Sequence, residues 1–164
     1  MPTTPLVVYD CMVYLQAATN PNGPAFRCFE AVDAKLVSLL VCPTIIAELN
    51  DVLNRPHLRT KFKRLTPERA AEFLERILLL ADHRPDAAQR FSLPRDPDDE
   101  AYLNLAIEAQ ASHLVTWNER HLTYLMTSDA AEAVEFRRQF PMLNILSPPA
   151  FLHAINFTSG EKST

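Results

Sequence analysis

Residues 95–118, RDPDDEAYLNLAIEAQASHLVTWN, form the stretch that decides the fold. The apolar residues Leu103 and Ile107 recur at the spacing of one helix face, which predicts a helix over 100–111. The apolar run at 113–116 then predicts a strand. A helix that leads directly into a short apolar strand is typical of α/β proteins, whose central sheet is mostly parallel.

The rest of the chain repeats this alternation of strands and helices. Further strands are expected over Leu6–Tyr9, Val37–Val41 and Leu143–Leu146. Further helices are expected over Pro24–Leu36, from Pro43 to about Asn54, from Pro67 onwards, over Ala130–Gln139 and from Pro148 onwards. We therefore expect one domain over 1–157, followed by a polar, disordered tail over 158–164.

Composition excludes several classes of protein. With only two glycines, the chain has no glycine-rich loop for a nucleotide phosphate, and it contains no GxSxG sequence around a nucleophilic serine. The three cysteines are odd in number and show no CxxC spacing, so reduced thiols are expected. No apolar run approaches the roughly 20 residues that cross a bilayer, and no secretory signal is evident. These features predict a cytoplasmic protein that does not insert in a membrane.

Charge is distributed unevenly along the chain. The net charge of −4 does not indicate a nucleic-acid binder, but a local basic patch is sufficient to hold phosphates. Five basic residues fall within ten positions that contain no acid, while four acids gather between 96 and 100. The basic run consists of Arg55, Arg59, Lys61, Lys63 and Arg64.

Several acidic side chains are predicted to meet at one edge of the sheet. Asp10 ends the first strand, and Asn118 lies just past the strand at 113–116. In open α/β sheets, sites form beyond the carboxyl ends of the strands. Glu48 and Asp99 belong to helices or helix starts that follow other segments. Carboxylates that converge in this way repel one another without a cation, and oxygen ligands suit Mg²⁺ or Mn²⁺.

Four stretches, in order, resemble the successive motifs of PIN domains. They are VVYDCMVYLQA, CPTIIAELNDVLNRPHL, RDPDDEAYLNLAIEAQASHLVTWN and ERHL, between about residues 5 and 155. The most similar group comprises the VapC-like toxins of bacterial toxin–antitoxin systems. This resemblance implies a three-layer α/β/α sandwich and Mg²⁺- or Mn²⁺-dependent cleavage of an RNA substrate. It also implies a small antitoxin protein as partner and a homodimer.

The resemblance assigns roles to individual residues. Asp10, Glu48 and Asp99 match the catalytic acids, with Asp96 as a supporting acid and Glu100 as a neighbour that could substitute. The expected metal ligands are Asp10, Glu48, Asp96, Asp99, Glu100 and Asn118. Two positions depart from the family pattern: Met12 stands where a polar residue is usual, and Asn118 stands where many relatives carry an acid.

Each assignment has a simpler structural alternative. Asp10 could cap a helix, Glu48 could form a salt bridge with Arg55 or another basic residue, and the acids near 99 could stabilise a first helical turn. Arg59, Lys61, Lys63 and His121 are the candidate substrate-binding residues, against the alternative of an exposed, solvated face.

The function has alternatives as well. A catalytically weak PIN-like module that binds RNA or protein is the first, and Met12 and Asn118 favour it. A PIN nuclease that acts in RNA processing, or on DNA, is another.

Overall fold

The computed structural model describes residues 3–93 and 95–157. Its strands are β1 (Leu6–Tyr9), β2 (Ser38–Val41), β3 (Asp82–His83), β4 (His113–Val115) and β5 (Asn144–Leu146). Its α-helices are α1 (Cys11–Thr19), α2 (Pro24–Asp33), α3 (Pro43–Leu53), α4 (Pro56–Lys61), α5 (Pro67–Leu80), α6 (Glu100–Glu108), α7 (Ala131–Gln139) and α8 (Pro148–Ala154). Two 3₁₀ helices, η1 (Pro97–Asp99) and η2 (Thr123–Met126), complete it.

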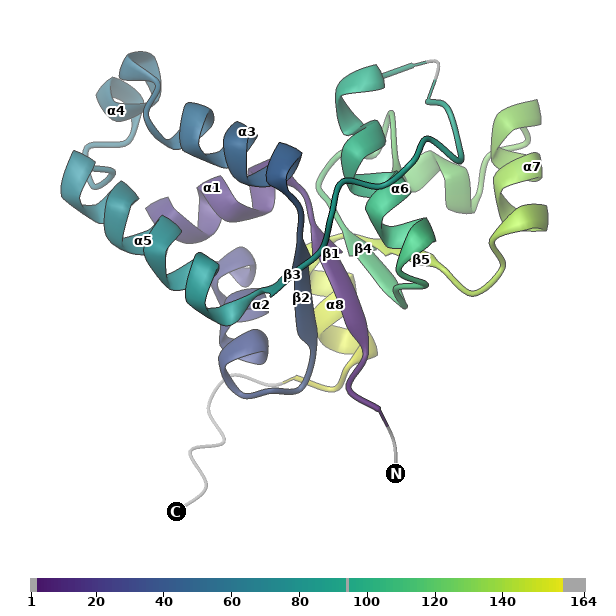
Figure 1. The fold of residues 1–164 in the computed structure, drawn as a ribbon, viewed down its shortest axis with the longest axis horizontal. Helices are drawn as coiled ribbons and strands as arrows, with labels where there is room; N and C mark the ends of the chain where they lie inside the picture. Colours follow the sequence, from purple (N-terminus) through teal and green to yellow (C-terminus); the bar gives the residue numbers. More distant parts are fainter. Residues whose placement is uncertain (1–2, 94, 158–164) are drawn as a thin grey trace.

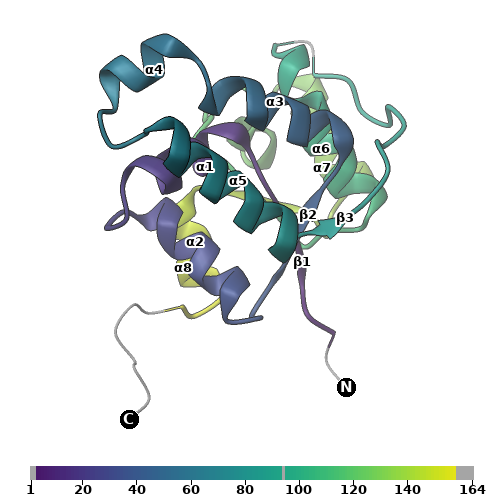
Figure 2. The ribbon, with the colours of Figure 1, turned by 60° about the vertical axis from the view of Figure 1, so that its left-hand side comes forward.

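The strands form one five-stranded sheet in the order β3-β2-β1-β4-β5, and every pair is parallel. Helices α1, α2, α5 and α8 lie on one side of the sheet, while α6 and α7 lie on the other (Figure 1). Figure 2 shows α3 crossing above one end of the strands, with α4 beyond it. The expected α/β fold, a three-layer α/β/α sandwich with a parallel sheet, is confirmed.

The central strands are apolar because helices cover both of their faces. Val7, Val8 and Tyr9 of β1 are all buried, and so are the last three residues of β2. Consecutive buried residues of this kind are typical of parallel sheets. They explain why short continuous apolar runs in the sequence predicted these strands correctly.

Proline and small polar residues set the starts of the helices. Proline lies in the first turn of α2, α3, α4, α5 and α8, where its missing N–H would have no helical partner. Thr66 caps α5 by accepting a hydrogen bond from the backbone of Arg69, and Ser147 caps α8 in the same way. The predicted starts of α3, α5 and α8 are therefore confirmed.

Two helices end earlier than expected. The helix predicted over Pro24–Leu36 ends at Asp33, and the helix predicted to reach Ala111 ends at Glu108. Lys35 and Gln110 follow these ends with φ angles of 59° and 56°. A left-handed residue after a helix is usually glycine, so these lysine and glutamine positions carry no recognisable stop signal.

Besides the two 3₁₀ helices, three elements were not predicted: α1, α4 and β3. Helix α1 packs between α2, α3 and α5, and it buries Val13, Tyr14, Leu15 and Ala17. A helix enclosed by neighbours needs no polar face, so its sequence lacks the apolar periodicity that identifies a surface helix. Helix α4 and strand β3 have six and two residues, too few to show any period.

The cysteines are free thiols, as expected, with Cys28 and Cys42 buried and Cys11 half-buried. None of the described helices combines the length and apolar character needed to span a lipid bilayer. The tail predicted over 158–164 lies outside the described residues.

Candidate active site

The candidate site lies where the winding of the sheet changes direction. From β1 the chain moves to β2 and β3 on one side, whereas β4 and β5 lie on the other. Tyr9 pairs with Val115, and the backbone N–H of Asp10 donates to the Val115 carbonyl at 3.0 Å. Asp10 and Thr116 therefore emerge side by side at the carboxyl ends of neighbouring strands, which is where α/β sheets bind ligands.

Asp10 is held by two donors. Its Oδ1 accepts from the backbone N–H of Val13 at 3.2 Å, so Asp10 caps helix α1. Its Oδ2 accepts from the hydroxyl of Thr116. Only 4% of Asp10 is exposed, and this burial is the main reason that its pKa rises to about 6. The capping alternative is thus correct, and it is compatible with a place in the site.

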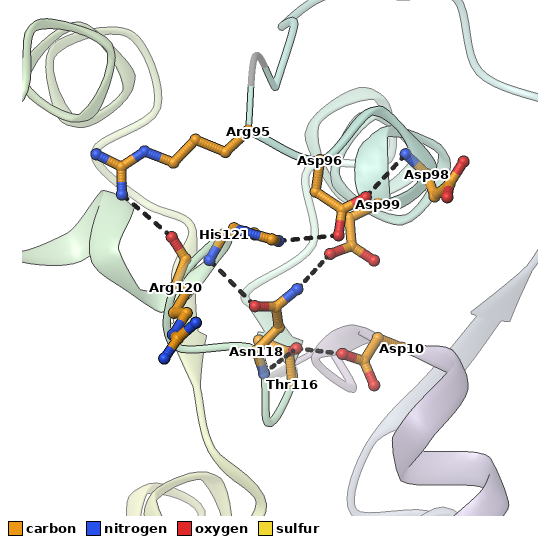
Figure 3. A network of polar contacts seen from close by, with 9 residues as sticks. All are labelled: Asp10, Arg95, Asp96, Asp98, Asp99, Thr116, Asn118, Arg120 and His121. Carbon is orange, nitrogen blue, oxygen red and sulfur yellow. Dashed lines mark hydrogen bonds and ion pairs between the residues drawn. The ribbon is translucent and has the colours of Figure 1, made fainter.

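A second group of polar residues lies beside Asp10 (Figure 3). The side-chain amide of Asn118 donates to Asp99 Oδ2 at 2.7 Å, and its oxygen accepts from the backbone N–H of His121 at 3.1 Å. The Nδ1 of His121 lies 3.0 Å from Asp96 Oδ2. One ligand atom from each of Asp96, Asp99 and His121 lies within 4.8 Å of the others, close enough to hold one metal ion.

Electrostatic repulsion accompanies this convergence. The pKa of Asp99 rises to about 7, mainly because of burial and then because of the charges of Asp96 and Asp10. Asp10 and Asp99 both have raised pKa values, so a cation bound between them would be stabilised by their negative charges. The carboxylate oxygens of Asp96 and Asp99 fit Mg²⁺ or Mn²⁺.

Glu48 reaches the same cleft from α3. Its Oε2 accepts a hydrogen bond of 2.8 Å from the hydroxyl of Tyr102, which belongs to α6. Arg55, the partner that the alternative interpretation gave to Glu48, instead bonds Asp51 at 2.7 Å. Among the described residues, Glu48 forms no salt bridge with Arg55 or any other base, so that alternative is wrong.

An open cleft of about 610 Å³ is lined by Asp10, Glu48, Asp96, Asp99 and Asn118 together with other residues. Five acids form one part of its wall, while Arg55, His57 and Lys61 form another. Met12 and Trp117 add exposed apolar surface. The acids are Asp10, Glu48, Asp96, Asp98 and Asp99.

Other residues that the sequence had singled out point elsewhere. The carboxylate of Glu100 accepts hydrogen bonds from the backbone of Leu93, the hydroxyl of Ser92 and the amide of Gln89, and Glu100 does not line the cleft. The guanidinium of Arg59 bonds the side chain of Asn54. Lys61 lines the cleft, whereas Arg59, Lys63 and His121 are not among its lining residues.

Sequence reasoning missed two residues that hold the acids, Thr116 and Tyr102. Thr116 had a usable signal, because it is the last residue of the strand predicted over 113–116, at the same edge as Asp10. Tyr102 had no such signal, because it lies 54 positions after Glu48 in the sequence. It was also not evident that Arg55 and His57 would line the cleft, because α4 was not recognised.

Fold and cleft together define an α/β protein with an acidic site at the carboxyl edge of a parallel sheet. The chain belongs to the PIN-domain family, which it matches over residues 6–120. Its fold is similar to a chain in the crystal structure of VapBC2 from Rickettsia felis bound to a DNA fragment from their promoter. Sequence identity is 17% and the TM-score is 0.54, and the match covers 87% of this chain and 98% of that chain. Among curated proteins, no match is found.

The raised pKa values predict how the stability of the metal-free protein depends on pH. Asp10 and Asp99 have folded-state pKa values of about 6 and 7, above the ordinary 3.8, so the folded protein binds more protons than the unfolded chain in this interval. The free energy of unfolding should therefore fall as pH rises from about 4 to about 8. Thermal unfolding of EDTA-treated protein across this range measures the effect.

Asp99→Asn should recover part of this loss, about 1–2 kcal/mol at pH 8 once the partial exposure of Asp99 is taken into account. Asp129→Asn, at an exposed position that does not line the cleft, is the matched control and should change little. If the two variants unfold alike at pH 8, charge crowding at Asp99 does not affect stability.

Proposed function

We propose that this protein is a divalent-metal-dependent endoribonuclease that hydrolyses phosphodiester bonds of RNA, and that it is the toxin of a toxin–antitoxin pair. The observation that carries the proposal is the gathering of Asp10, Glu48 and Asp99 in one cleft of a PIN domain. These three are the proposed catalytic residues.

The proposed metal ligands are Asp10, Glu48, Asp96 and Asp99, and the ion is Mg²⁺ or Mn²⁺. A bound ion supplies positive charge at the phosphate and lowers the pKa of a coordinated water. The fold holds these carboxylates in position, and the carboxylates can exchange protons with their surroundings. Cys11 has no nucleophilic part in this scheme, because burial and the nearby Glu48 and Asp10 raise its pKa to about 12.

Asn118 fits a positioning role better than a ligand role. Its amide nitrogen faces Asp99, and its oxygen is already bonded to the backbone of His121. Glu100 is left out of the proposed site because its carboxylate binds the 89–93 segment. His121 is proposed to act through Asp96, which its imidazole contacts.

The basic residues of the cleft suit a polyanionic substrate. The protein carries a net charge of −4, so contacts to phosphates must come from a local group. Lys61, Arg55 and His57 provide one within the same cleft as the acids. Trp117, which is 37% exposed, offers a face on which an unpaired base can stack. A single-stranded segment of RNA matches both features.

The proposed partner is a small antitoxin protein, in keeping with the likeness to the VapBC2 structure. A homodimer stays a prediction. A catalytically weak module that binds RNA or protein is the second candidate function, because Met12 lines the cleft and Asn118 brings no charge. A nuclease in RNA processing would share the site and differ in its RNA target.

The first test removes charge from each proposed catalytic acid. Asp10→Asn, Glu48→Gln and Asp99→Asn should each retain the fold and lower Mg²⁺- or Mn²⁺-dependent RNA cleavage by on the order of 10²–10³, the usual loss of an electrostatic stabiliser. Cleavage of single-stranded RNA is followed with either ion and with an EDTA control. Parental rates in all three variants would refute the site. If the parental protein binds RNA without a metal ion and does not cleave it, the second candidate function, a module that binds without cutting, is favoured.

The second test adds charge at Asn118. In Asn118→Asp, a carboxylate replaces the amide that now donates to Asp99 at 2.7 Å, and the two like charges repel until a cation binds. Metal affinity, measured without RNA by calorimetry, should rise by on the order of tenfold. Unchanged affinity would place residue 118 outside the electrostatic reach of the ion.

The third test compares two lysines of the basic run. Lys61 lines the cleft and Lys63 does not, although both are exposed. Lys61→Ala should weaken RNA binding and reduce the slope of log affinity against log salt by about 0.7, the value for one contact to a single strand. Lys63→Ala should have a smaller effect. Equal slopes for Lys61→Ala and the parental protein would exclude a phosphate contact.

A further inference from the structure

Each of the three proposed catalytic acids accepts a hydrogen bond from an uncharged side chain. Thr116 donates to Asp10, Asn118 donates to Asp99, and Tyr102 donates to Glu48. The first two donors lie two residues apart, just after β4. Tyr102 is separate: it comes from α6 and reaches across to α3.

We propose that Tyr102 is a positioning residue that fixes the carboxylate of Glu48 for metal binding. The inference rests on the proposed function, in which Glu48 is a metal ligand. The hydroxyl of Tyr102 lies 2.8 Å from Oε2 of Glu48, and among the described residues no other hydrogen bond to this carboxylate is found. Tyr102 is therefore the contact that restricts its orientation.

The two side chains are brought together by helix packing. On α3, Ile45 and Leu49 are buried, and Glu48 lies three residues after the first and next to the second, half-buried at the margin of the same face. Tyr102 is fully buried in α6, which contacts α3. A ring enclosed on all sides has little freedom, so its hydroxyl is a fixed donor.

A fixed donor matters because glutamate is flexible. A glutamate side chain without a partner loses conformational entropy when a metal ion confines it to one rotamer. A hydrogen bond that already confines the side chain lowers this entropic cost of metal binding. A neutral donor also leaves the carboxylate its full negative charge. An arginine in the same place would compete with the cation, and the nearby Arg55 is instead bonded to Asp51.

Tyr14 provides a matched control within the same chain. It is also fully buried, and it lies on α1, close behind Asp10. Its hydroxyl, however, has no hydrogen-bond partner among the described residues. Replacing either tyrosine by phenylalanine removes one buried hydroxyl and keeps the ring, so the two variants differ in whether a contact to Glu48 is lost.

The experiment measures the Kd for Mn²⁺ in the full chain without RNA, by electron paramagnetic resonance of the free ion. Tyr102→Phe should raise the Kd roughly tenfold, the lower end of the effect expected when a metal ligand loses its hydrogen-bond partner. Tyr14→Phe should stay within about twofold of the parental protein. Circular dichroism and thermal unfolding confirm that each variant is folded.

A second comparison tests whether Tyr102 acts through Glu48. In a Glu48→Gln background, the added Tyr102→Phe should change the Kd by less than about twofold, because no carboxylate remains to be oriented. An equal effect in both backgrounds would show that Tyr102 acts by another route and would overturn the inference.

Two further outcomes are distinguishable. If Glu48→Gln weakens Mn²⁺ binding but Tyr102→Phe does not, the proposed metal site stands and the role of Tyr102 is refuted. If Asp10→Asn, Glu48→Gln and Asp99→Asn all bind Mn²⁺ as the parental protein does, the metal site itself is wrong, and the inference about Tyr102 fails with it.

Discussion

The parallel pairing of β1 with β4 is the interaction on which the rest of the structure depends. These strands are adjacent in the sheet although about a hundred residues separate them in the chain, and the pairing of Tyr9 with Val115 sets their register. A shift of β4 by one residue along β1 would turn the side chains of β4 to the opposite faces of the sheet. It would also separate Asp10 from Thr116. The hydrophobic core and the cleft therefore share one constraint.

The cleft brings together acidic side chains whose ionisation is unfavourable in the absence of a cation. Burial raises the pKa of Asp10, and burial together with neighbouring acids raises that of Asp99. A fold optimised for stability alone would pair these carboxylates with cationic side chains. Here the basic residues Arg55 and Lys61 lie in the same cleft, but the hydrogen bonds to the three proposed catalytic acids come from neutral groups. Among the described residues, the three acids therefore have no cationic side chain bonded to them, and a bound metal ion would stabilise their ionised forms, as the proposed nuclease requires.

The way in which the acids are held follows from where they lie in the fold. Asp10 begins a helix and uses one oxygen as its cap, so the backbone itself fixes its position. Asp99 ends a 3₁₀ turn and is held by Asn118 from the adjacent loop. Glu48 lies in mid-helix, where no backbone group is free to bind it, and a side chain from another helix must take that part.

The sequence by itself determined four of the five strands, the starts of most helices and the place of Asp10 at the end of a strand. Those features depend on neighbouring residues: buried strands are short apolar runs, Thr66 and Ser147 cap the helices that follow them, and Asp10 directly follows a strand. Resemblance to PIN domains added Glu48 and Asp99. Only the tertiary structure decided which donor holds each acid, that Glu100 turns to the 89–93 segment, and that α1 is a helix. These outcomes depend on contacts between residues far apart in the chain, and such contacts leave no periodic or local signal in the sequence.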